Sequence, residues 1–573
     1  MATTIPSLWR VNNRDEEAES ALREALGVGG LVATVLAQRG FGPAEAEKFL
    51  HAGIDQLHSP KLLPDYEKAR DEILGAMERK ERIYIHGDYD VDGVTSAAIL
   101  TRCLRNMGAD VHVHVPHRVK EGYGIHPMAV QEAKDVGASL FLTCDCGIVA
   151  HDQIRQATEL GLRVVVTDHH EPGTTLPSAQ AIVNPHRADS RYPFADLCGA
   201  GVALKLCAGL AEEKGIAPQN FYRAFLDLAA VGTVADVMPL VGENRIIVRH
   251  GLPLLQATKK VGLQSLIRLA VKEGTSSLKA WHIGFNLAPR LNAAGRLDDA
   301  ARSLQLLLTT DGSEAQEIAE GLDTLNRERQ EEQKRMIEEA IGVVIERGLE
   351  SDPVLVVHQS GWHHGIIGLA AGKLVERFRR PAFVIGIDPE SGVGKGSARS
   401  IPGFHLANAL HSMPDLVKGG GHELAAGFSV DLDKVGAFRD ALIRHAATLE
   451  DFQPGHVPID ITAEVRAEEV TLDSVQEMEI LEPFGMGNPS PLFLTRKLRV
   501  EEKRVMGKEG THVSLILRSL AGSQRQITAW NMADSLSGVH VGQFIDVVYN
   551  PVQDTYQGNT KLKWNLRDWV HSA

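Results

Sequence analysis

The chain of 573 residues has no apolar run long enough to span a bilayer, and residues 1–10 lack the basic-then-apolar pattern of a signal peptide. It has five cysteines, an odd number, and none of them belongs to a Cys-x-x-Cys pair. This usage argues against a disulfide framework and a structural zinc site, and it is typical of a reducing compartment. Internal repeats and low-complexity tracts are also missing. We therefore expect a cytoplasmic protein that does not enter a membrane.

The composition is that of a globular protein. Apolar residues make up 43% of the chain and charged residues 23%. A chain of this length is long enough for about three or four domains of ordinary size.

Four short acidic or histidine-rich segments carry most of the information about chemistry. They lie at residues 86–93 (HGDYDVDG), 144–147 (CDCG), 168–170 (DHH) and 234–237 (VADV). The first three follow short apolar runs typical of buried strands in a parallel sheet, at residues 83–85, 140–142 and 164–166. Because the carboxyl ends of such strands open onto one crevice, these segments are expected to meet there.

Carboxylates gathered in one crevice repel one another, and a cation removes that repulsion. The available ligands are His86, Asp90, Asp92, Asp145, His169 and Asp236. Mostly carboxylate ligands favour Mn²⁺ or Mg²⁺ over Zn²⁺, and Asp145 in the middle of the sheet is placed to bridge two ions. Two ions about 3.5–4 Å apart clamp the attacking and leaving oxygens of a phosphoryl transfer. The alternative for each segment is an ordinary turn with a helix-capping Asp.

The neighbouring cysteines fit neither a disulfide nor a metal site. We interpret Cys144 and Cys146 as small residues that fill the end of the strand beside Asp145.

The His-x3-Asp-x-Asp and Asp-His-His segments resemble those of the DHH phosphoesterase superfamily. Further motifs in the chain resemble those of one branch of this superfamily, the bacterial single-strand-specific 5′ to 3′ exonucleases. These motifs lie at residues 288–296, 361–368, 396–400, 419–422 and 482–489. The resemblance covers most of the chain, with no departure at the metal-ligand positions.

The resemblance implies a division of the ligands between two ions. His86, Asp90 and Asp145 would hold one, and Asp92, Asp145, His169 and Asp236 the other. Asp88 and Asp168 are then expected to orient histidines or water. His170 is expected to point at a phosphate oxygen; the alternative is a hydrogen-bonded core histidine.

Protein donors are expected to stabilise the charge that develops on the transferring phosphorus. The candidates are Arg290, Asn292, Arg296 and His422. The triple glycine at residues 419–421 would let the backbone approach a phosphate, although such a cluster also occurs in flexible turns.

An exonuclease must also recognise a strand end. We hypothesise a 5′-phosphate pocket formed by Arg118 with Ser397 and Arg399 of a turn at residues 396–399, because guanidinium groups suit phosphate oxygens. The alternative is surface arginines in salt bridges. Tyr123, close to Arg118 in the sequence, would stack on a base or pack in the core.

The predicted fold class is α/β with a C-terminal barrel. The expected parts are an N-terminal lead (1–64), a DHH-type parallel-sheet catalytic domain (65–255), a helical connector (256–352), a second α/β domain of the DHHA1 type (353–452) and an OB-type barrel (457–573). The connector includes a long charged helix at residues 322–341. Strands are also expected at residues 110–115, 354–357, 383–387, 513–517, 526–530 and 544–549.

The net charge of −14 is unusual for a nucleic-acid enzyme, but local charge is the better guide. Between residues 491 and 530, eight basic residues face three acidic ones. A barrel with such a basic strand face is suited to single-stranded nucleic acid.

These observations predict a metal-dependent exonuclease that degrades single-stranded DNA 5′ to 3′ to mononucleotides, and the resemblance implies a role in recombination and repair. It also implies a single-strand-binding protein and a helicase as partners, although no motif marks either contact. One alternative is a phosphodiesterase for short oligoribonucleotides or cyclic dinucleotides. Another is a scaffold that binds nucleic acid without catalysis, which the complete set of ligands disfavours.

Overall fold

The computed structural model describes residues 8–118, 120–297, 299–450, 452–455, 457–556 and 559–572. The chain forms two compact units. The first contains the N-terminal stretch up to Glu47, Arg329–Ile480 and the C-terminal stretch from Ser490. The second contains Lys48–Glu328 and a short segment from far along the chain, Leu481–Pro489. The expected N-terminal lead is thus divided between the two units.

The second unit is built on a five-stranded parallel sheet of order β3-β2-β4-β5-β6. Its strands are β2 (Arg82–His86), β3 (Val111–His114), β4 (Ala138–Thr143), β5 (Arg163–Thr167) and β6 (Ala181–Val183). The expected parallel sheet is confirmed, with β4 at its centre. Strand β6 was not foreseen, because three residues are too few for a periodic pattern.

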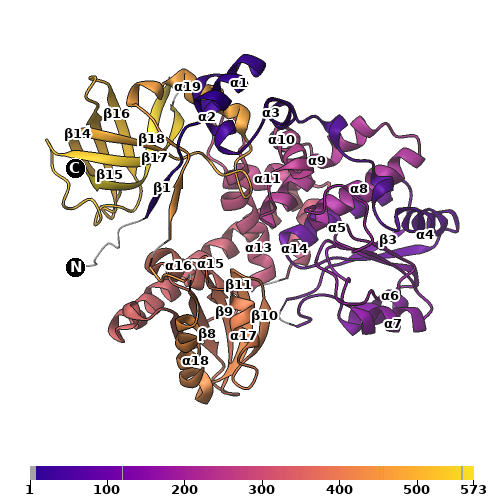
Figure 1. The fold of residues 1–573 in the computed structure, drawn as a ribbon. Coiled ribbons are helices and arrows are strands. Elements are labelled where there is room, and N and C mark those ends of the chain that lie inside the picture. Colours follow the sequence, from indigo (N-terminus) through magenta and orange to yellow (C-terminus); the bar gives the residue numbers. More distant parts are fainter. Residues whose placement is uncertain are drawn as a thin grey trace. The chain divides into compact units, whose positions relative to one another are not determined.

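Helices cover both faces of this sheet (Figure 1). Successive side chains of a strand point to opposite faces, so Ile83 and Ile85 join one core cluster while Tyr84 joins the other. The helices of the sheet region are α4 (Tyr66–Glu78), α5 (Val91–Asn106), α6 (Pro127–Asp135), α7 (His151–Glu159), α8 (Gly199–Glu213), α9 (Pro218–Ala235) and α10 (Gly242–Gln256). Helices α5, α8 and α9 pack on the first face, and α6 and α7 on the second.

A helical region follows. It contains α11 (Val261–Ala270), α12 (Ala280–His282), the π-helical turn η3 (Ile283–Leu287), α13 (Ala288–Leu297) and α14 (Ala301–Leu308). The helix α15 (Gly312–Glu346) then runs for 35 residues. Its residues up to Glu328 belong to the second unit and those from Arg329 to the first. The expected long connecting helix is confirmed and extends beyond the predicted range in both directions.

The first unit contains a second α/β sheet of order β10-β11-β9-β8-β7, in which only β7 and β8 are parallel. Its strands are β7 (Leu355–Ser360), β8 (Ala382–Ile387), β9 (Val393–Arg399), β10 (Lys418–Gly421) and β11 (Ala425–Asp431). Its helices are α16 (Ile367–Phe378), α17 (Leu406–His411) and α18 (Val435–Ala447).

The expected turn at residues 396–399 was wrong, because these residues lie inside strand β9. A Cβ on Gly396 would lie 2.1 Å from Cζ of Phe428, so the glycine makes room for that ring. The triple glycine likewise lies in edge strand β10, where a Cβ on Gly419 would lie 2.4 Å from the Gly427 carbonyl oxygen. Both glycines allow close packing between strands. In a sequence, a glycine needed for such packing looks the same as a glycine needed for a turn.

The C-terminal part of the first unit is a closed barrel (Figure 1). Its sheet has the order β13-β14-β15-β16-β18-β17, and pairing of β14 with β17 closes it. The strands are β13 (Ala463–Glu464), β14 (Phe493–Met506), β15 (His512–Arg518), β16 (Gln524–Ala529), β17 (Phe544–Tyr556) and β18 (Asn559–His571), and α19 (Leu472–Glu477) precedes β14. The OB-type barrel is confirmed.

The N-terminal stretch also belongs to this unit. Strand β1 (Trp9–Val11) pairs in parallel with β12 (Ile459–Ile461), and the Trp9 indole N–H donates to Asp568 at 2.7 Å. Helices α1 (Glu16–Leu26), α2 (Gly30–Gln38) and α3 (Pro43–Leu50) follow. Among the described residues no single helix is apolar and long enough to cross a bilayer, and only the pair α1 and α2, bent by 120°, meets that criterion together.

Candidate metal centre at the carboxyl edge of the parallel sheet

The loop after β2 is shaped by one cap and one glycine. Asp90 caps α5 by accepting a hydrogen bond from the Gly93 N–H at 3.0 Å. A Cβ on Gly93 would lie 2.5 Å from the Asp88 carbonyl oxygen, so only glycine fits this close approach. The loop therefore turns back on itself and holds Asp88, Asp90 and Asp92 within a few residues of the strand end.

Asp92 is held by the N-terminus of α8. Its carboxylate accepts the Gly199 N–H at 2.6 Å and the Ala200 N–H at 2.9 Å. A Cβ on Gly199 would lie 2.6 Å from Cβ of Asp145, so this helix end also approaches the central strand. Sequence analysis missed Gly199 and Ala200, and the only available signal was a glycine at the start of an apolar helix.

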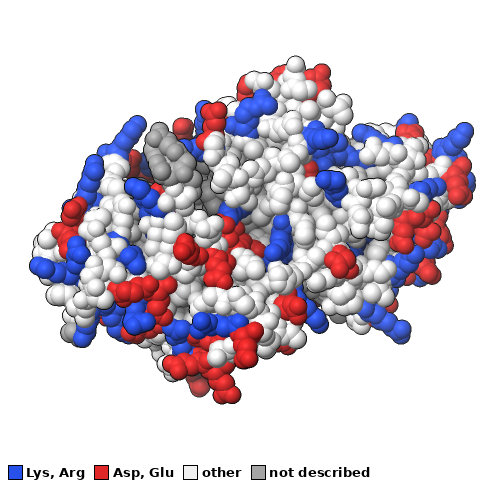
Figure 2. Space-filling model, turned by 90° about the horizontal axis from the view of Figure 1, so that it is seen from above, with Lys and Arg blue, Asp and Glu red and all other residues white. Residues whose placement is uncertain are grey.

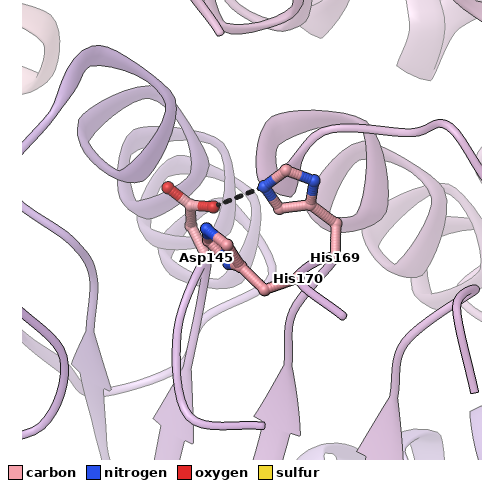
Figure 3. Close-up of side chains that lie close together, drawn as sticks. All are labelled: Asp145, His169 and His170. Carbon is pink, nitrogen blue, oxygen red and sulfur yellow. Dashed lines mark ion pairs between the residues drawn. The ribbon is translucent and has the colours of Figure 1, made fainter. Parts of the chain in front are cut away.

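Asp145 follows the central strand β4 and is buried. Its φ of 61° lies in the left-handed region, which Asp tolerates better than most residues. Figure 3 shows its carboxylate facing the His169 ring, with 3.1 Å between Asp145 Oδ1 and His169 Nε2. The same Nε2 lies 3.7 Å from Asp236 Oδ2 and 3.8 Å from Asp92 Oδ2. Four of the six predicted ligands therefore meet around His169, and a fifth, Asp90, lies close to Asp145.

Three groups in this cluster have ligand atoms within 4.8 Å of one another. They are Asp92, His169 and Asp236; Asp88, Asp90 and Asp145; and Asp145, His169 and His170. The first group is the predicted set for one ion without the bridging Asp145, and the second is the predicted set for the other ion with Asp88 in place of His86. His86 is the buried last residue of β2, and its Nε2 lies 3.2 Å from the Gly124 carbonyl oxygen.

Crowding and burial strongly raise the pKa values of several carboxylates in this cluster. Burial, and then the charges of Asp92 and Asp90, raise the pKa of Asp145 well above its usual range. Burial and the same two charges raise the pKa of Asp236 to about 8. Burial, followed by the charge of Asp90, raises the pKa of Asp88 to about 8. A bound cation would reverse these shifts, because it stabilises the ionised carboxylates.

Three buried polar atoms of this cluster have no hydrogen-bond partner among the described residues. They are His86 Nδ1, Asp88 Oδ1 and Asp145 Oδ1, although the last of them also lies 3.1 Å from His169 Nε2. Buried polar atoms rarely remain unpaired, so each such atom calls for a ligand. Carboxylate oxygens in the majority, with a minority of imidazoles, suit Mn²⁺ or Mg²⁺, and the residues therefore fit divalent cations.

Asp168 and His170 form a pair beside the cluster. Asp168 Oδ1 lies 2.7 Å from His170 Nδ1, and the carboxylate also accepts the backbone N–H groups of Ile148 and His169. Burial alone would lower the pKa of His170, but the hydrogen bond and charge of Asp168 raise it to about 9. The Tyr123 hydroxyl lies 3.3 Å from His170 Nε2, and this tyrosine is exposed rather than part of the core.

Two of the predicted arginines in the second unit have neighbours in the structure. The Arg118 guanidinium lies 5.0 Å from the centre of the Tyr89 ring, next to the metal-binding loop. Arg290 donates to Asp323 at 2.8 Å and to the Asn286 carbonyl oxygen at 2.7 Å. These contacts orient Arg290 within the helical region.

Asn292 and Arg296 lie on α13. That helix approaches the metal-binding loop closely, because a Cβ on Gly295 would lie 2.8 Å from the Tyr89 carbonyl oxygen. The roles of both side chains stay predictions.

The remaining predicted residues lie in the first unit. Ser397 and Arg399 are neighbours on β9, with 3.3 Å between the guanidinium and the hydroxyl oxygen. Burial lowers the pKa of Arg399, and this arginine makes no ion pair among the described residues. His422 directly follows β10 and is exposed, and its backbone N–H donates to the Ala425 carbonyl oxygen at 2.8 Å. Their assignment to a phosphate pocket and to catalysis stays a prediction.

The basic strand face of the barrel is smaller than the sequence suggested. Arg496, Lys503, Arg518 and Arg525 hydrogen-bond to acidic side chains or backbone carbonyls of the same unit. The other four of the eight predicted basic residues are exposed and make no ion pair among the described residues: Lys497, Arg499, Arg504 and Lys508. On the face that Figure 2 shows, Lys and Arg side chains are interspersed with Asp and Glu side chains.

Comparison with known proteins agrees with this architecture. Family models match residues 82–233 as the N-terminal domain of the DHH family, residues 351–448 as a DHHA1 domain and residues 461–568 as a RecJ OB domain.

The relatives point to one family. The single-stranded-DNA-specific exonuclease RecJ of Bacillus subtilis is 40% identical over 566 residues, which cover 98% of this chain and 70% of the relative. The protein of that name from Thermus thermophilus is 37% identical over 87% of this chain and 72% of its own. The crystal structure of Thermus thermophilus RecJ with Mn²⁺ matches with a TM-score of 0.83 and 33% identity, over 99% of this chain and 80% of that one. The chain belongs to the RecJ family.

Proposed function

We propose that this protein is a metal-dependent exonuclease that degrades single-stranded DNA from its 5′ end to mononucleotides, in recombination and repair. The observation that carries the proposal is the cluster of Asp92, Asp145, His169 and Asp236 at the carboxyl edge of the sheet. Relatives that cover most of the chain are named single-stranded-DNA-specific exonucleases. Structures of such relatives contain Mn²⁺ or Mg²⁺, which are the ions that this donor set favours.

The side chains divide into those that hold cations and those that hold substrate. When bound, two divalent ions would supply activation of the attacking water and stabilisation of charge on the phosphoryl group. Asp92, His169 and Asp236 would hold one ion, and Asp88, Asp90 and Asp145 the other. Two further assignments are kept as proposed: His86 as a ligand beside these groups and Asp145 as the bridge.

His170 is proposed to donate a hydrogen bond to a phosphate oxygen. Its pKa of about 9 in the structure keeps the ring protonated at neutral pH, and its hydrogen bond with Asp168 fixes the orientation of the ring. Arg290, Asn292, Arg296 and His422 are proposed as further donors to the substrate.

The 5′ polarity rests on recognition of a terminal phosphate. Arg118, Ser397 and Arg399 are proposed to bind this phosphate, and the Arg399 guanidinium, which lies beside the Ser397 hydroxyl and has no ion pair among the described residues, supports the proposal. Tyr123 is proposed to stack on a base, which its exposed ring permits.

The comparisons favour this function over the alternatives. A phosphodiesterase for short oligoribonucleotides or cyclic dinucleotides would share the metal centre, but it would not need a closed barrel of the RecJ OB type. A scaffold without catalysis would not need a full set of ligands around orphaned buried atoms.

The test is digestion of single-stranded DNA labelled at its 3′ end, with Mn²⁺ or Mg²⁺, by the wild type and an Asp145→Asn variant. We expect a ladder that requires the metal and a free 5′ end, and an Asp145→Asn rate lower by more than about a hundredfold. Asp152→Asn is the matched control, because Asp152 is an exposed carboxylate of the same unit.

A wild type that cleaves dinucleotides but not long strands would contradict the proposal. So would an Asp145→Asn variant as active as the control.

A single-strand-binding protein and a helicase are proposed as partners on the strength of family membership alone. Co-purification with each partner in the absence of DNA would test them.

A further inference from the structure

Asp236 reaches the metal centre differently from the other predicted ligands. It does not follow a strand; it is the residue directly after α9, at the start of the loop 236–241 that leads to α10. Its backbone N–H donates to the Gly232 carbonyl oxygen of α9 at 2.9 Å, so its position depends on the last turn of that helix and on the loop that follows.

The loop is held in a conformation that its own sequence disfavours. Val237 has a φ of 59°, in the left-handed region, where a β-branched side chain is strained. Such strain persists only when surrounding contacts impose it. On the helix side, the Met238 N–H donates to the Thr233 carbonyl oxygen at 3.2 Å, and the Asn244 amide donates to the Pro239 carbonyl oxygen at 3.1 Å.

A second set of contacts comes from residues 481–489, a segment that we call the clasp. The Leu240 N–H donates to the Met486 carbonyl oxygen at 2.7 Å. Gly487, with a φ of 68°, packs against Pro239 so closely that a Cβ would lie 3.0 Å from the proline Cβ. A Cβ on Gly485 would lie 2.7 Å from Cδ1 of Leu240.

The clasp is itself anchored in the second unit, although it comes more than two hundred residues later in the chain. Arg245 donates to the Leu481 carbonyl oxygen at 2.9 Å, and Lys279 pairs with Glu482 at 2.7 Å. The buried Asn488 side chain donates to the Leu481 and Pro483 carbonyl oxygens, which closes the clasp on itself.

We propose that the clasp is a positioning element of the metal centre: by holding the loop 236–241 it sets Asp236 at its distance from His169. Gly485 and Gly487 are the positioning residues, because they allow the clasp to touch the loop. This inference rests on the proposed metal centre and assigns a role to a segment outside the catalytic sheet.

The test is Mn²⁺ binding by the full chain, followed through the electron paramagnetic resonance signal of free Mn²⁺. In a Gly487→Ala variant, both the left-handed φ and the contact with Pro239 displace the loop. We expect the Mn²⁺ dissociation constant to rise about tenfold, the range seen when groups behind metal ligands are changed. Gly215→Ala is the matched control, because Gly215 has a φ of 76° and no atom within 4 Å of its Cβ position.

Two further measurements separate positioning from general loss of structure. Nuclease activity of Gly487→Ala should recover at high Mn²⁺, with kcat close to that of the control. Binding of single-stranded DNA in the presence of a chelator should stay unchanged. Gly485→Ala, which meets only the end of the flexible Leu240 side chain, should fold normally and raise the dissociation constant by a smaller factor.

Equal Mn²⁺ affinity in Gly485→Ala, Gly487→Ala and Gly215→Ala would overturn the proposed positioning role of the clasp. The proposed metal centre would not be affected by that result. A wild type that binds no Mn²⁺ would instead overturn the proposed function on which the inference depends.

Discussion

Asp168 shows how one buried carboxylate organises its neighbours in the site. It accepts the backbone N–H groups of Ile148, His169 and His170 and holds the His170 ring at 2.7 Å. Burial opposes its ionisation, but these hydrogen bonds and the charge of His170 lower the pKa of Asp168. The sequence analysis expected an orienting carboxylate here, and this arrangement is consistent with that role.

An Asp168→Asn variant should lower the pKa of His170 from about 9 towards its usual value of 6.5, because the hydrogen bond and charge of Asp168 are lost while the charges of Asp236 and Asp92 still oppose burial. Titration of the His170 ring by NMR in the metal-free protein measures this. The wild-type pair should stabilise the metal-free protein below pH 6.5 and lose that contribution as pH rises through about 9. An unchanged His170 titration in the variant would contradict the pairing.

At Arg399 the prediction concerns substrate recognition. Arg399→Ala should weaken processing of 5′-phosphorylated strands by about tenfold or more and affect 5′-hydroxyl strands less, since a charged hydrogen bond contributes about 1.5–3 kcal/mol. The rates on the two substrates are compared with those of Arg377→Ala, an arginine at the end of α16 in the same unit. An equal loss on both substrates would refute the pocket.

At the scale of elements, the N-terminus of α8 is built into the metal centre. Its first two N–H groups hold Asp92, and Gly199 leaves no room for a side chain against Asp145. A helix N-terminus favours negative charge, so it offsets part of the repulsion among the carboxylates.

Gly199→Ala should therefore weaken Mn²⁺ binding and destabilise the fold by about 1–3 kcal/mol, the usual cost of overpacking. Gly30→Ala is the control, because Gly30 also begins a helix and no atom lies within 4 Å of its Cβ position. Thermal unfolding and Mn²⁺ titration of both variants measure the difference. Equal unfolding temperatures and equal Mn²⁺ affinities of Gly199→Ala and Gly30→Ala would contradict the role of the α8 N-terminus.

At the scale of the whole molecule, the negative net charge disfavours binding of DNA, which is itself negatively charged. The chain carries −14, yet the barrel keeps exposed basic side chains that lack acidic partners among the described residues. Screening over about 8–10 Å separates such a local face from distant acidic groups.

The double variant Arg499→Ala with Arg504→Ala should weaken binding of single-stranded DNA and reduce its salt dependence. Each lost phosphate contact lowers the slope of log affinity against log salt by about 0.7. Arg518→Ala is the control, because its guanidinium pairs with Glu501. Salt titrations of DNA binding measure both slopes, and identical slopes would exclude these side chains from the interface.

The sequence by itself determined the parallel sheet and the positions of the ligands along the chain. Apolar runs before residues 86, 144 and 168 marked the strand ends, and parallel strands bring such ends to one edge. The closed barrel and the long helix were also readable, since alternating and charged helical patterns are local signals.

Only the tertiary structure decided how Asp92, Asp145 and Asp236 are held. Gly199 approaches Asp145 and Gly487 approaches Pro239, and these contacts between segments distant in sequence leave no periodic pattern in the chain. The glycines of β9 suggested a turn but lie in a strand where Gly396 makes room for Phe428, whereas the phosphate contact expected of the glycines in β10 stays a prediction. The physical reason is the same throughout: hydrophobic periodicity is a local property, whereas close approach of two backbones is settled only when the chain has folded.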